Sequence, residues 1–206
     1  MIVPEVNPDL VRDRPRGVLA GPGCTTLSMI VALGALHARY GLRELVVASC
    51  QAASGAGREG AGTLYAQLEK VGDDGWCSEE LGIRDECREV LGLPELKAAA
   101  TCVRVPVVTA HSVAVHAVFA ARVDRREAQD VLARSPGVVL CDNPEMLEFP
   151  APSDAAGTDP TWAGRVRRSP DDPRALDLFL CGDNLRKGAA LNTAQIAEPV
   201  AADLTP

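Results

Sequence analysis

The amino-acid sequence predicts an α/β (α+β) fold in which helices cover a mixed β-sheet. Segments with apolar residues at helical spacing alternate along the chain with short apolar or alternating segments that are typical of strands. The chain has 206 residues and 47% of them are hydrophobic, which is enough for one domain with a substantial core and too little for two full-sized enzyme domains. We therefore expect one domain over 1–206, with 1–23 as a lead-in and 199–206 as a fraying tail.

The first half of the chain is expected to contain three helices and a buried strand. A helix over 24–40 carries apolar residues at helical spacing and is followed by Gly41, a typical C-terminal stop. The apolar run 45–50 then predicts the buried strand. After a glycine-rich turn, further helices are expected around 62–71 and over 78–91.

Extended segments come next. The run 101–108 contains Pro106, which predicts a sheet edge or the end of a strand, because proline cannot donate to a ladder. Apolar residues alternate over 112–119, as in a half-buried strand. Asp124 followed by Glu127 is typical of a capping box at a helix start. The remaining elements are expected, in order, as a helix at 125–134, a strand at 137–141, a surface loop at 142–161, strands at 162–168 and 175–181, and a helix at 184–198.

Charge and hydropathy exclude two classes of partner. The formal net charge of −7 opposes binding to phosphate backbones, which need clustered Lys and Arg. No run of 18 apolar residues occurs, and the start of the chain has no basic segment followed by an apolar stretch. We expect no nucleic acid and no membrane as partner, and a cytoplasmic protein.

The seven cysteines are an odd number and include no C-x-x-C pair. We expect free thiols, most of them buried as small hydrophobic residues. A zinc site needs paired ligands at short spacing, and the three histidines do not supply them. His111 and His116, five residues apart on a predicted strand, point to opposite faces. No metal is therefore expected.

Four short blocks of sequence stand out. They are GPGCTT at 21–26, SCQAASGAG at 49–57, TCVRVP at 101–106 with AHS at 110–112, and DNLRKGAALN at 183–192. Together and in this order they resemble the aspartate-semialdehyde dehydrogenase family, whose versions are P-N-C-T-T, S-x-Q-A-x-S-G-A-G, T-C-V-R-V-P followed by G-H-S, and D-N-L-R-K-G-A-A-L-N. Any one block is a weak signal, but four in order over nearly the whole chain argue against a chance match. The resemblance implies the fold of that family's C-terminal catalytic domain and a role in amino-acid biosynthesis from aspartate.

Cys24 is the candidate nucleophile. At a helix start it lies beside unpaired backbone N–H groups and in the positive end of the helix dipole, and both are expected to lower the pKa of its thiol. The alternative for a lone cysteine is a small residue that fills a tight Gly-Pro-Gly turn. The other three blocks favour the nucleophile.

The resemblance implies roles for four further residues. His111 matches the general acid/base that serves the cysteine, work that suits imidazole because its ordinary pKa is near neutrality. Arg104 matches the arginine that binds the substrate's α-carboxylate with a planar fork of donors. Gln51 matches the glutamine that orients the acyl group, and Glu79 matches the glutamate that binds the substrate's ammonium. The structural alternatives are a core histidine, a surface ion pair for Arg104, and helix capping by Glu79.

Several positions depart from the family pattern. The family's asparagine before the cysteine is Gly23 here, and the lysine of its E-E-x-K block, which helps to bind the phosphate of aspartyl phosphate, is Gly82. The stretch between Gly57 and Glu79 is shorter than in the family and lacks a strand, so one strand region of the sheet is expected to be shortened. Gly55 and Gly57 of the sequence GAGREG at 55–60 belong to the second block and not to a dinucleotide fingerprint, and the family's NADP-binding domain would precede residue 1, so we expect no cofactor.

These features predict cysteine-dependent acyl (thioester) chemistry on an aspartate-like activated amino acid without hydride transfer. The acyl group would pass from Cys24 to water or to an amine-type nucleophile, as in a thioesterase or an acyltransferase. The alternative is a non-catalytic or auxiliary subunit that pairs with a full-length homologue or an NADP-binding partner; a second copy of the chain is the other expected protein partner. Gly23 and Gly82 favour this alternative. The enzyme is favoured by the joint retention of Cys24, Gln51, Arg104 and His111.

Overall fold

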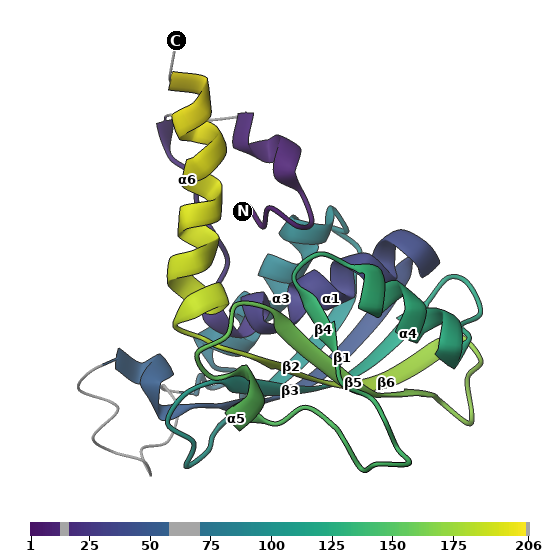
Figure 1. Cartoon of the computed structure of the whole chain (residues 1–206). Coiled ribbons are helices and arrows are strands. Elements are labelled where there is room, and N and C mark those ends of the chain that lie inside the picture. Colours follow the sequence, from purple (N-terminus) through teal and green to yellow (C-terminus); the bar gives the residue numbers. More distant parts are fainter. Residues whose placement is uncertain (13–16, 58–70, 205–206) are drawn as a thin grey trace.

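The computed structural model describes residues 1–12, 17–57 and 71–204, and its centre is one six-stranded sheet with the order β2-β1-β3-β6-β5-β4 (Figure 1). The strands are β1 (Leu42–Gln51), β2 (Lys97–Arg104), β3 (His111–Phe119), β4 (Val138–Leu140), β5 (Thr161–Arg168) and β6 (Ala175–Gly182). The α-helices are α1 (Cys24–Tyr40), α3 (Ser78–Leu91), α4 (Arg125–Arg134), α5 (Pro152–Ala155) and α6 (Leu191–Leu204). Shorter helical turns are η1 (Pro8–Arg12), η3 (Ala53–Ala56) and the π-helix η4 (Arg186–Ala190). The predicted α/β fold with a mixed sheet is confirmed.

The pairing of the strands brings three of the candidate residues to one edge of the sheet. β1 pairs in parallel with β2, so Gln51 and Arg104 are direct neighbours at the carboxyl ends of these strands. β1 pairs antiparallel with β3, and this places His111, the first residue of β3, at the same edge. Residues far apart in the sequence are thus aligned by backbone register alone.

Most elements lie where the sequence predicts them. The helix predicted at 24–40 is α1, and Gly41 ends it with a left-handed φ of 73°. Only the first half of the run predicted at 101–108 is strand: the edge strand β2 begins four residues earlier, at Lys97, and ends at Arg104, before Pro106. The helix predicted around 62–71 lies almost wholly outside the described residues, so it stays a prediction.

The helix predicted at 125–134 is α4, although its cap is simpler than a capping box. Asp124 accepts hydrogen bonds from the backbone N–H groups of Arg126 and Glu127. The Glu127 carboxylate pairs with Arg39 of α1 instead of returning to the cap. The predicted helix start is therefore correct. The predicted return bond from Glu127 is replaced by its pairing with Arg39.

The chain ends differently from the single helix predicted at 184–198. The π-helix η4 comes first, and α6 then continues through Pro199 to Leu204, so most of the predicted tail at 199–206 is helical. Figure 1 shows α6 standing away from the sheet, beside the N-terminal segment. Ile2, Val11 and Ile196 form a small apolar cluster there.

The π turn also changes which face of this region is buried. Helical spacing predicts one common face for Leu185, Ala189, Asn192 and Ile196. Leu185 is instead 50% exposed, and Lys187 is buried. A π turn holds an extra residue, which shifts the phase of all side chains before it. The Lys187 ammonium pairs with Glu5 at 2.6 Å, which joins the N-terminal segment to η4.

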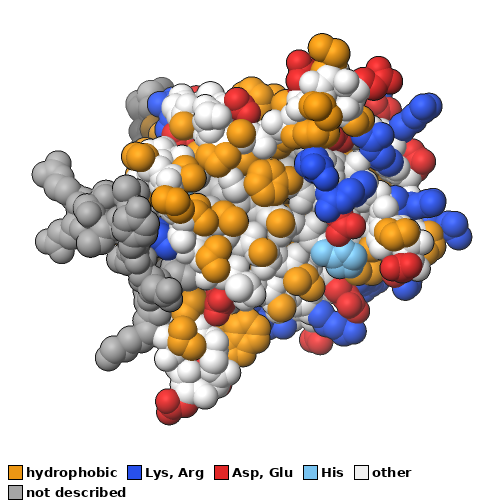
Figure 2. Space-filling model, turned by 90° about the horizontal axis from the view of Figure 1, so that it is seen from below, with side chains coloured by type: hydrophobic (Ala, Val, Ile, Leu, Met, Phe, Trp, Pro, Cys, Tyr) orange, Lys and Arg blue, Asp and Glu red, His pale blue; other side chains and the backbone are white. Residues whose placement is uncertain are grey.

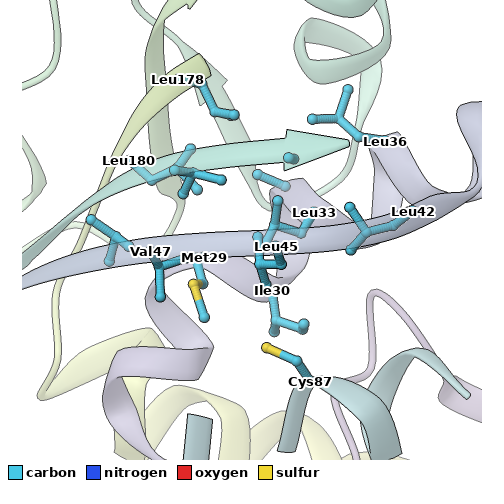
Figure 3. Packing of buried hydrophobic residues seen from close by; sticks show 14 of the residues in the cluster. Met29, Ile30, Leu33, Leu36, Leu42, Leu45, Val47, Cys87, Leu178 and Leu180 are labelled. Carbon is cyan, nitrogen blue, oxygen red and sulfur yellow. The ribbon is translucent and has the colours of Figure 1, made fainter. Parts of the chain in front are cut away.

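The hydrophobic core lies between the sheet and the helices α1, α3 and α4, which share one face of the sheet (Figure 1). α1 is the central helix, buried on nearly all sides, as expected of a helix that is apolar all round. Figure 3 shows Met29 and Leu33 of α1 close to Leu45 of β1 and Leu180 of β6. Full burial of each such side chain stabilises the fold by about 1.5–3 kcal/mol, so Cys24 begins a firmly packed helix.

The opposite face of the sheet is open over much of the described chain, and hydrophobic side chains gather on it (Figure 2). Val46 is 54% exposed and Val103 45% exposed. His116 also lies on this face, where it contacts Asp177 at 2.9 Å, while His111 is buried on the helix side, as predicted for residues five apart on a strand. The loop predicted at 142–161 contains the short helix α5, which packs on β5 and β6 and covers one part of this face.

Candidate active site

Cys24 is the first residue of α1, and its side chain is partly exposed. The Sγ atom lies 3.3 Å from Nε2 of His111. A nucleophile and its proton-transfer partner need this kind of hydrogen-bond contact. Behind the thiol, Gly188 of η4 packs so closely that a Cβ on it would lie 3.1 Å from Cβ of Cys24. Three separate segments of the chain therefore fix the position of the sulfur.

A backbone amide orients the His111 ring. The N–H of Ala52 donates to Nδ1 of His111 over 3.0 Å, so in the neutral ring the hydrogen is on Nε2 and faces the Cys24 sulfur. Burial lowers the pKa of His111 to about 4; the charge of Arg104 acts in the same direction and Asp183 opposes it. His111 is thus neutral at pH 7 and donates toward the sulfur.

The residue before His111 is in a conformation that favours glycine. Ala110 has a φ of 75°, in the left-handed region. Its N–H donates to Oδ1 of Asn184 over 3.0 Å, and Nδ2 of Asn184 donates to the hydroxyl of Ser54 over 3.0 Å. Asn184, from the fourth sequence block, therefore holds both the turn into β3 and the loop after β1.

Arg104 lies beside His111 at the end of β2. Its Nη1 donates to the carbonyl oxygen of Ala52 over 2.6 Å. Gly55 covers both side chains, since a Cβ on it would lie 2.9 Å from Cε1 of His111 and 3.1 Å from Nη1 of Arg104. A residue without Cβ is needed for this close approach. The S-G-A-G segment of the second block thus packs directly on the guanidinium and the imidazole.

Gln51 and Glu79 form a hydrogen-bonded group next to Cys24. Nε2 of the buried Gln51 donates to Oγ1 of Thr25 over 3.0 Å and also to Oε1 of Glu79. Oγ1 of Thr25 donates to the same Glu79 oxygen over 2.7 Å. Helix capping, the structural alternative for Glu79, is done by its neighbour Glu80, which accepts backbone N–H groups of Cys77 and Cys102. The structure therefore brings all five sequence-predicted site residues together.

Sequence reasoning missed Glu86. Its carboxylate accepts the backbone N–H of Gly23 over 2.9 Å and the hydroxyl of Thr26. α1 has no side-chain cap of its own, so this carboxylate from α3 satisfies the N-terminus of α1. A signal was present in the sequence, because Glu86 follows Glu79 by seven residues and so lies two turns along the same face of α3.

The expectation that the pKa of the Cys24 thiol is lowered was wrong. Burial and the Glu79 carboxylate raise this pKa, and hydrogen bonds from Thr25 lower it by less. The backbone N–H groups at the start of α1 also lower this pKa, but burial and Glu79 outweigh them. With His111 neutral, the resting pair is a thiol and an imidazole instead of a thiolate and an imidazolium.

A cleft of about 310 Å³ opens beside Cys24, between the start of α1 and the first turns of α3. Glu79 and Glu86 contribute carboxylates to its lining, and the described lining residues include no Lys or Arg. Gly82 is also part of the lining, and a Cβ on it would meet none of the described atoms within 4 Å. A small molecule can therefore reach the sulfur through this cleft.

The described residues offer no site for a metal ion, no membrane span and no helix start suited to a dinucleotide. In 1–12, 17–57 and 71–204, no three His, Cys, Asp or Glu side chains gather into a group that could hold a metal, and no helix is long and apolar enough to cross a membrane. β1 and β2 are a parallel pair, and α3, which begins at Ser78 and precedes β2, carries Glu79 and Glu80 in its first turn, where a pyrophosphate needs free N–H groups. This helix start does not fit a dinucleotide.

Comparison with known proteins decides the family. The family described as "Semialdehyde dehydrogenase, dimerisation domain" matches residues 33–187. The chain belongs to the semialdehyde dehydrogenase family. The aspartate-semialdehyde dehydrogenase of Streptomyces akiyoshiensis is 39% identical over 99% of this chain and 70% of its own length, and that of Synechocystis sp. is 38% identical over 96% of this chain and 66% of its own. The chain thus spans about two thirds of the length of these curated relatives.

Solved structures of this semialdehyde dehydrogenase family confirm the fold. Aspartate semialdehyde dehydrogenase II from Vibrio cholerae superposes with a TM-score of 0.94 at 31% identity, over 100% of this chain and 69% of that protein. A probable aspartate-semialdehyde dehydrogenase from Pseudomonas aeruginosa gives a TM-score of 0.90 at 26% identity, over 99% of this chain and 69% of that one. The resemblance drawn from the four blocks is confirmed at the level of family and fold.

Proposed function

We propose that this family member forms a thioester between Cys24 and the β-carbonyl of an aspartate-like donor, and passes the acyl group on without hydride transfer. One observation carries the proposal. The Cys24 sulfur lies 3.3 Å from Nε2 of His111, and both the thiol and the carboxylate of Glu79 line an accessible cleft. A core cysteine would be packed on all sides instead.

The chemistry follows from the protonation states of the pair. Sγ attacks the β-carbonyl carbon, the donor's bond to its leaving group breaks, and the proton of Cys24 ends on the released group. Solvent in the cleft takes the thiol proton and returns one to the leaving group, while the Nε2–H of His111 faces the sulfur and stabilises the thiolate by a hydrogen bond as it forms. Attack by a second nucleophile then breaks the C–S bond and returns the proton to Cys24.

Binding of the amino-acid end is proposed for Arg104 and Glu79. The guanidinium lies beside His111, where a planar fork can bind the donor's α-carboxylate. The carboxylate of Glu79 lies near the sulfur, where it can pair with the donor's ammonium. Gln51 bonds both Thr25 and Glu79, which suits it to orient the acyl group.

The absence of hydride transfer is part of the proposal and rests on the residues present. The glycine-rich sequence GAGREG at 55–60 follows β1, but its Gly55 packs on His111 and Arg104, and α3, the helix before β2, carries two carboxylates in its first turn. An auxiliary subunit that pairs with a full-length homologue is the alternative, and it is the outcome if Cys24 proves unreactive toward every acyl donor.

A matched set of three donors tests the proposal. The β-thioester of aspartate carries both the carboxylate and the ammonium, the succinyl thioester lacks the ammonium, and the β-alanyl thioester lacks the carboxylate. Arg104→Ala should slow thiol release from the first two donors by about 30-fold to several-thousand-fold, the loss of roughly 2–5 kcal/mol expected for a charge-assisted contact, and leave the third unchanged. Glu79→Gln should spare the succinyl donor instead.

If the wild-type protein releases thiol from all three donors no faster than Cys24→Ser does, the proposal is contradicted. The auxiliary subunit is then the remaining function. Equal losses on all three donors in Arg104→Ala would show that Arg104 acts on the fold of the site and not on the α-carboxylate.

We also infer that two copies of the chain associate through the open face of the sheet. The family that matches is described as a dimerisation domain, and the face carries exposed apolar residues such as Val46 and Val103. Self-complementary association buries the same patch on both copies.

A further inference from the structure

We propose that the cleft beside Cys24 is a subsite for a protonated amine, and that this amine is the acceptor of the acyl group. The assignment of the acceptor rests on the proposed thioester function, whereas the charge preference of the cleft does not. The amine would lie over Gly82, near the carboxylate of Glu86, and apart from the donor's own ammonium at Glu79.

The charges that surround the cleft support a cation. Glu79 and Glu86 give the described lining a formal charge of −2, with no Lys or Arg to offset it. A helix N-terminus normally attracts an anion, but that of α1 is already occupied, because the N–H of Gly23 bonds Oε1 of Glu86. An incoming phosphate would meet a carboxylate at this place, and an ammonium would be paired by it.

The shape of the cleft supports a small acceptor. Its volume is about 310 Å³, and the space above Gly82 is open, since a Cβ there would meet no described atom within 4 Å. Ile83 supplies an apolar surface in the same lining. A short primary alkylamine, with one charged end and an apolar chain, fits these contacts.

The transfer balances as follows. The ammonium first loses a proton to a carboxylate of the cleft, which passes it to solvent. The free amine attacks the carbonyl carbon of the thioester, a C–N bond forms and the C–S bond breaks. The second amine proton goes to the departing Cys24 thiolate, and an amide and a thiol remain.

The charge preference is tested with two reagents that convert a thiol into a mixed disulfide, cationic 2-aminoethyl methanethiosulfonate and anionic 2-sulfonatoethyl methanethiosulfonate. Their rates at Cys24, located by peptide mapping, are divided by their rates with free cysteine. We expect the corrected ratio to favour the cation by about tenfold or more, the size expected for carboxylates within a screening length of the sulfur.

Variants at Gly82 provide the control. Gly82→Lys should bring the corrected ratio to one or below, while Gly82→Gln, of similar length and without charge, should stay within about twofold of wild type. A ratio of one in the wild type, or equal collapse in both variants, would overturn the cation subsite.

The acceptor role is tested on the acylated protein. Once the β-aspartyl thioester of Cys24 has formed, ethylamine should shorten its lifetime by about tenfold more than it does for the same thioester free in solution, and the N-ethyl amide should appear. An acylated protein that ethylamine attacks no faster would overturn the acceptor assignment and leave the proposed function intact. A protein that is never acylated would contradict the proposed function, and the reagent ratio would still decide the charge of the cleft.

Discussion

At the scale of single residues, the reactivity of Cys24 depends on its neighbours more than on its place in a helix. A helix start was expected to lower the pKa of the thiol, yet burial and the Glu79 carboxylate raise it by more than the hydrogen bonds at the helix start lower it. An ammonium bound at Glu79 would remove part of this repulsion. The nucleophile is then activated by the substrate that it attacks.

The pH dependence of alkylation follows from this arrangement. A thiolate beside a carboxylate is destabilised, so the alkylation rate of Cys24 by iodoacetamide should rise with pH through a midpoint above the ordinary thiol value of 9.0. Glu79→Gln should move the midpoint to lower pH. Rates at Cys24 are followed by peptide mapping between pH 6 and 10.5, and a wild-type rate already at its plateau at pH 7 would contradict the account.

Ala110 offers a test of strain beside the active site. Its φ of 75° costs an L-residue roughly 1–2 kcal/mol in the folded protein. Replacement by glycine removes this strain, but glycine also has more conformational freedom in the unfolded chain, which offsets part of the gain. Ala110→Gly should therefore raise the free energy of unfolding by about 0.5–1 kcal/mol, measured by urea denaturation. The control is Ala117→Gly, at a buried extended position of β3, which should lower it by a similar amount. Destabilisation by both changes would show that Ala110 is not strained.

At the scale of elements, α3 both supports the site and carries a residue that weakens the helix. Gly82 lies in the interior of α3, where glycine costs about 0.5–1 kcal/mol relative to alanine. Because a Cβ on Gly82 meets no described atom within 4 Å, Gly82→Ala should stabilise the protein by that amount. Thermal unfolding measures the change.

Gly34 in α1 provides the matched control. It is also a helix-interior glycine, but a Cβ on it would lie 2.9 Å from Cγ2 of Val6. In Gly34→Ala the same gain in helix propensity should be offset by overpacking against Val6. The free energy of unfolding should therefore stay unchanged or decrease. Equal stabilisation by the two changes would show that space around the glycine does not decide the outcome.

The elements that sequence patterns predicted best are those that obey local rules. α1 has apolar periodicity and a glycine stop, and α3 has both as well, so their bounds were predicted correctly. The π-helix η4 was not predicted, and its buried Lys187 pairs with Glu5, about 180 residues away in the chain. Long-range contacts of this kind leave no periodic signal.

The candidate site also contains residues with a clear sequence signal and residues without one. Cys24, Gln51, Arg104 and His111 lie in short blocks, and the convergence of the last three follows once the register of β1, β2 and β3 is known. Glu86 lies in no distinctive block. The backbone N–H of Ala52, which orients His111, carries no side-chain signal. The candidate residues could therefore be chosen from the sequence, whereas the raised pKa of Cys24 and the lowered pKa of His111 could not be foreseen.

At the scale of the whole molecule, the open face of the sheet should decide the oligomeric state. Val46 is 54% exposed at the middle of β1 on this face, so Val46→Asp would place two carboxylates at a symmetric interface and should dissociate the dimer. Light scattering after size exclusion measures the mass. Leu10→Asp is the control, because Leu10 is 42% exposed on η1, away from the sheet. A wild-type protein that is monomeric at tens of micromolar would contradict the proposed interface.

The central claim is that Cys24 accepts an acyl group from an aspartate-like donor in a protein that performs no hydride transfer. Intact-mass analysis after incubation with the β-thioester of aspartate, without nicotinamide cofactor, tests it most directly. We expect one added aspartyl group that maps to Cys24, is absent in Cys24→Ser, and is lost in Arg104→Ala. A protein that stays unmodified with every amino-acid donor, or that carries the adduct equally in Cys24→Ser, would contradict it.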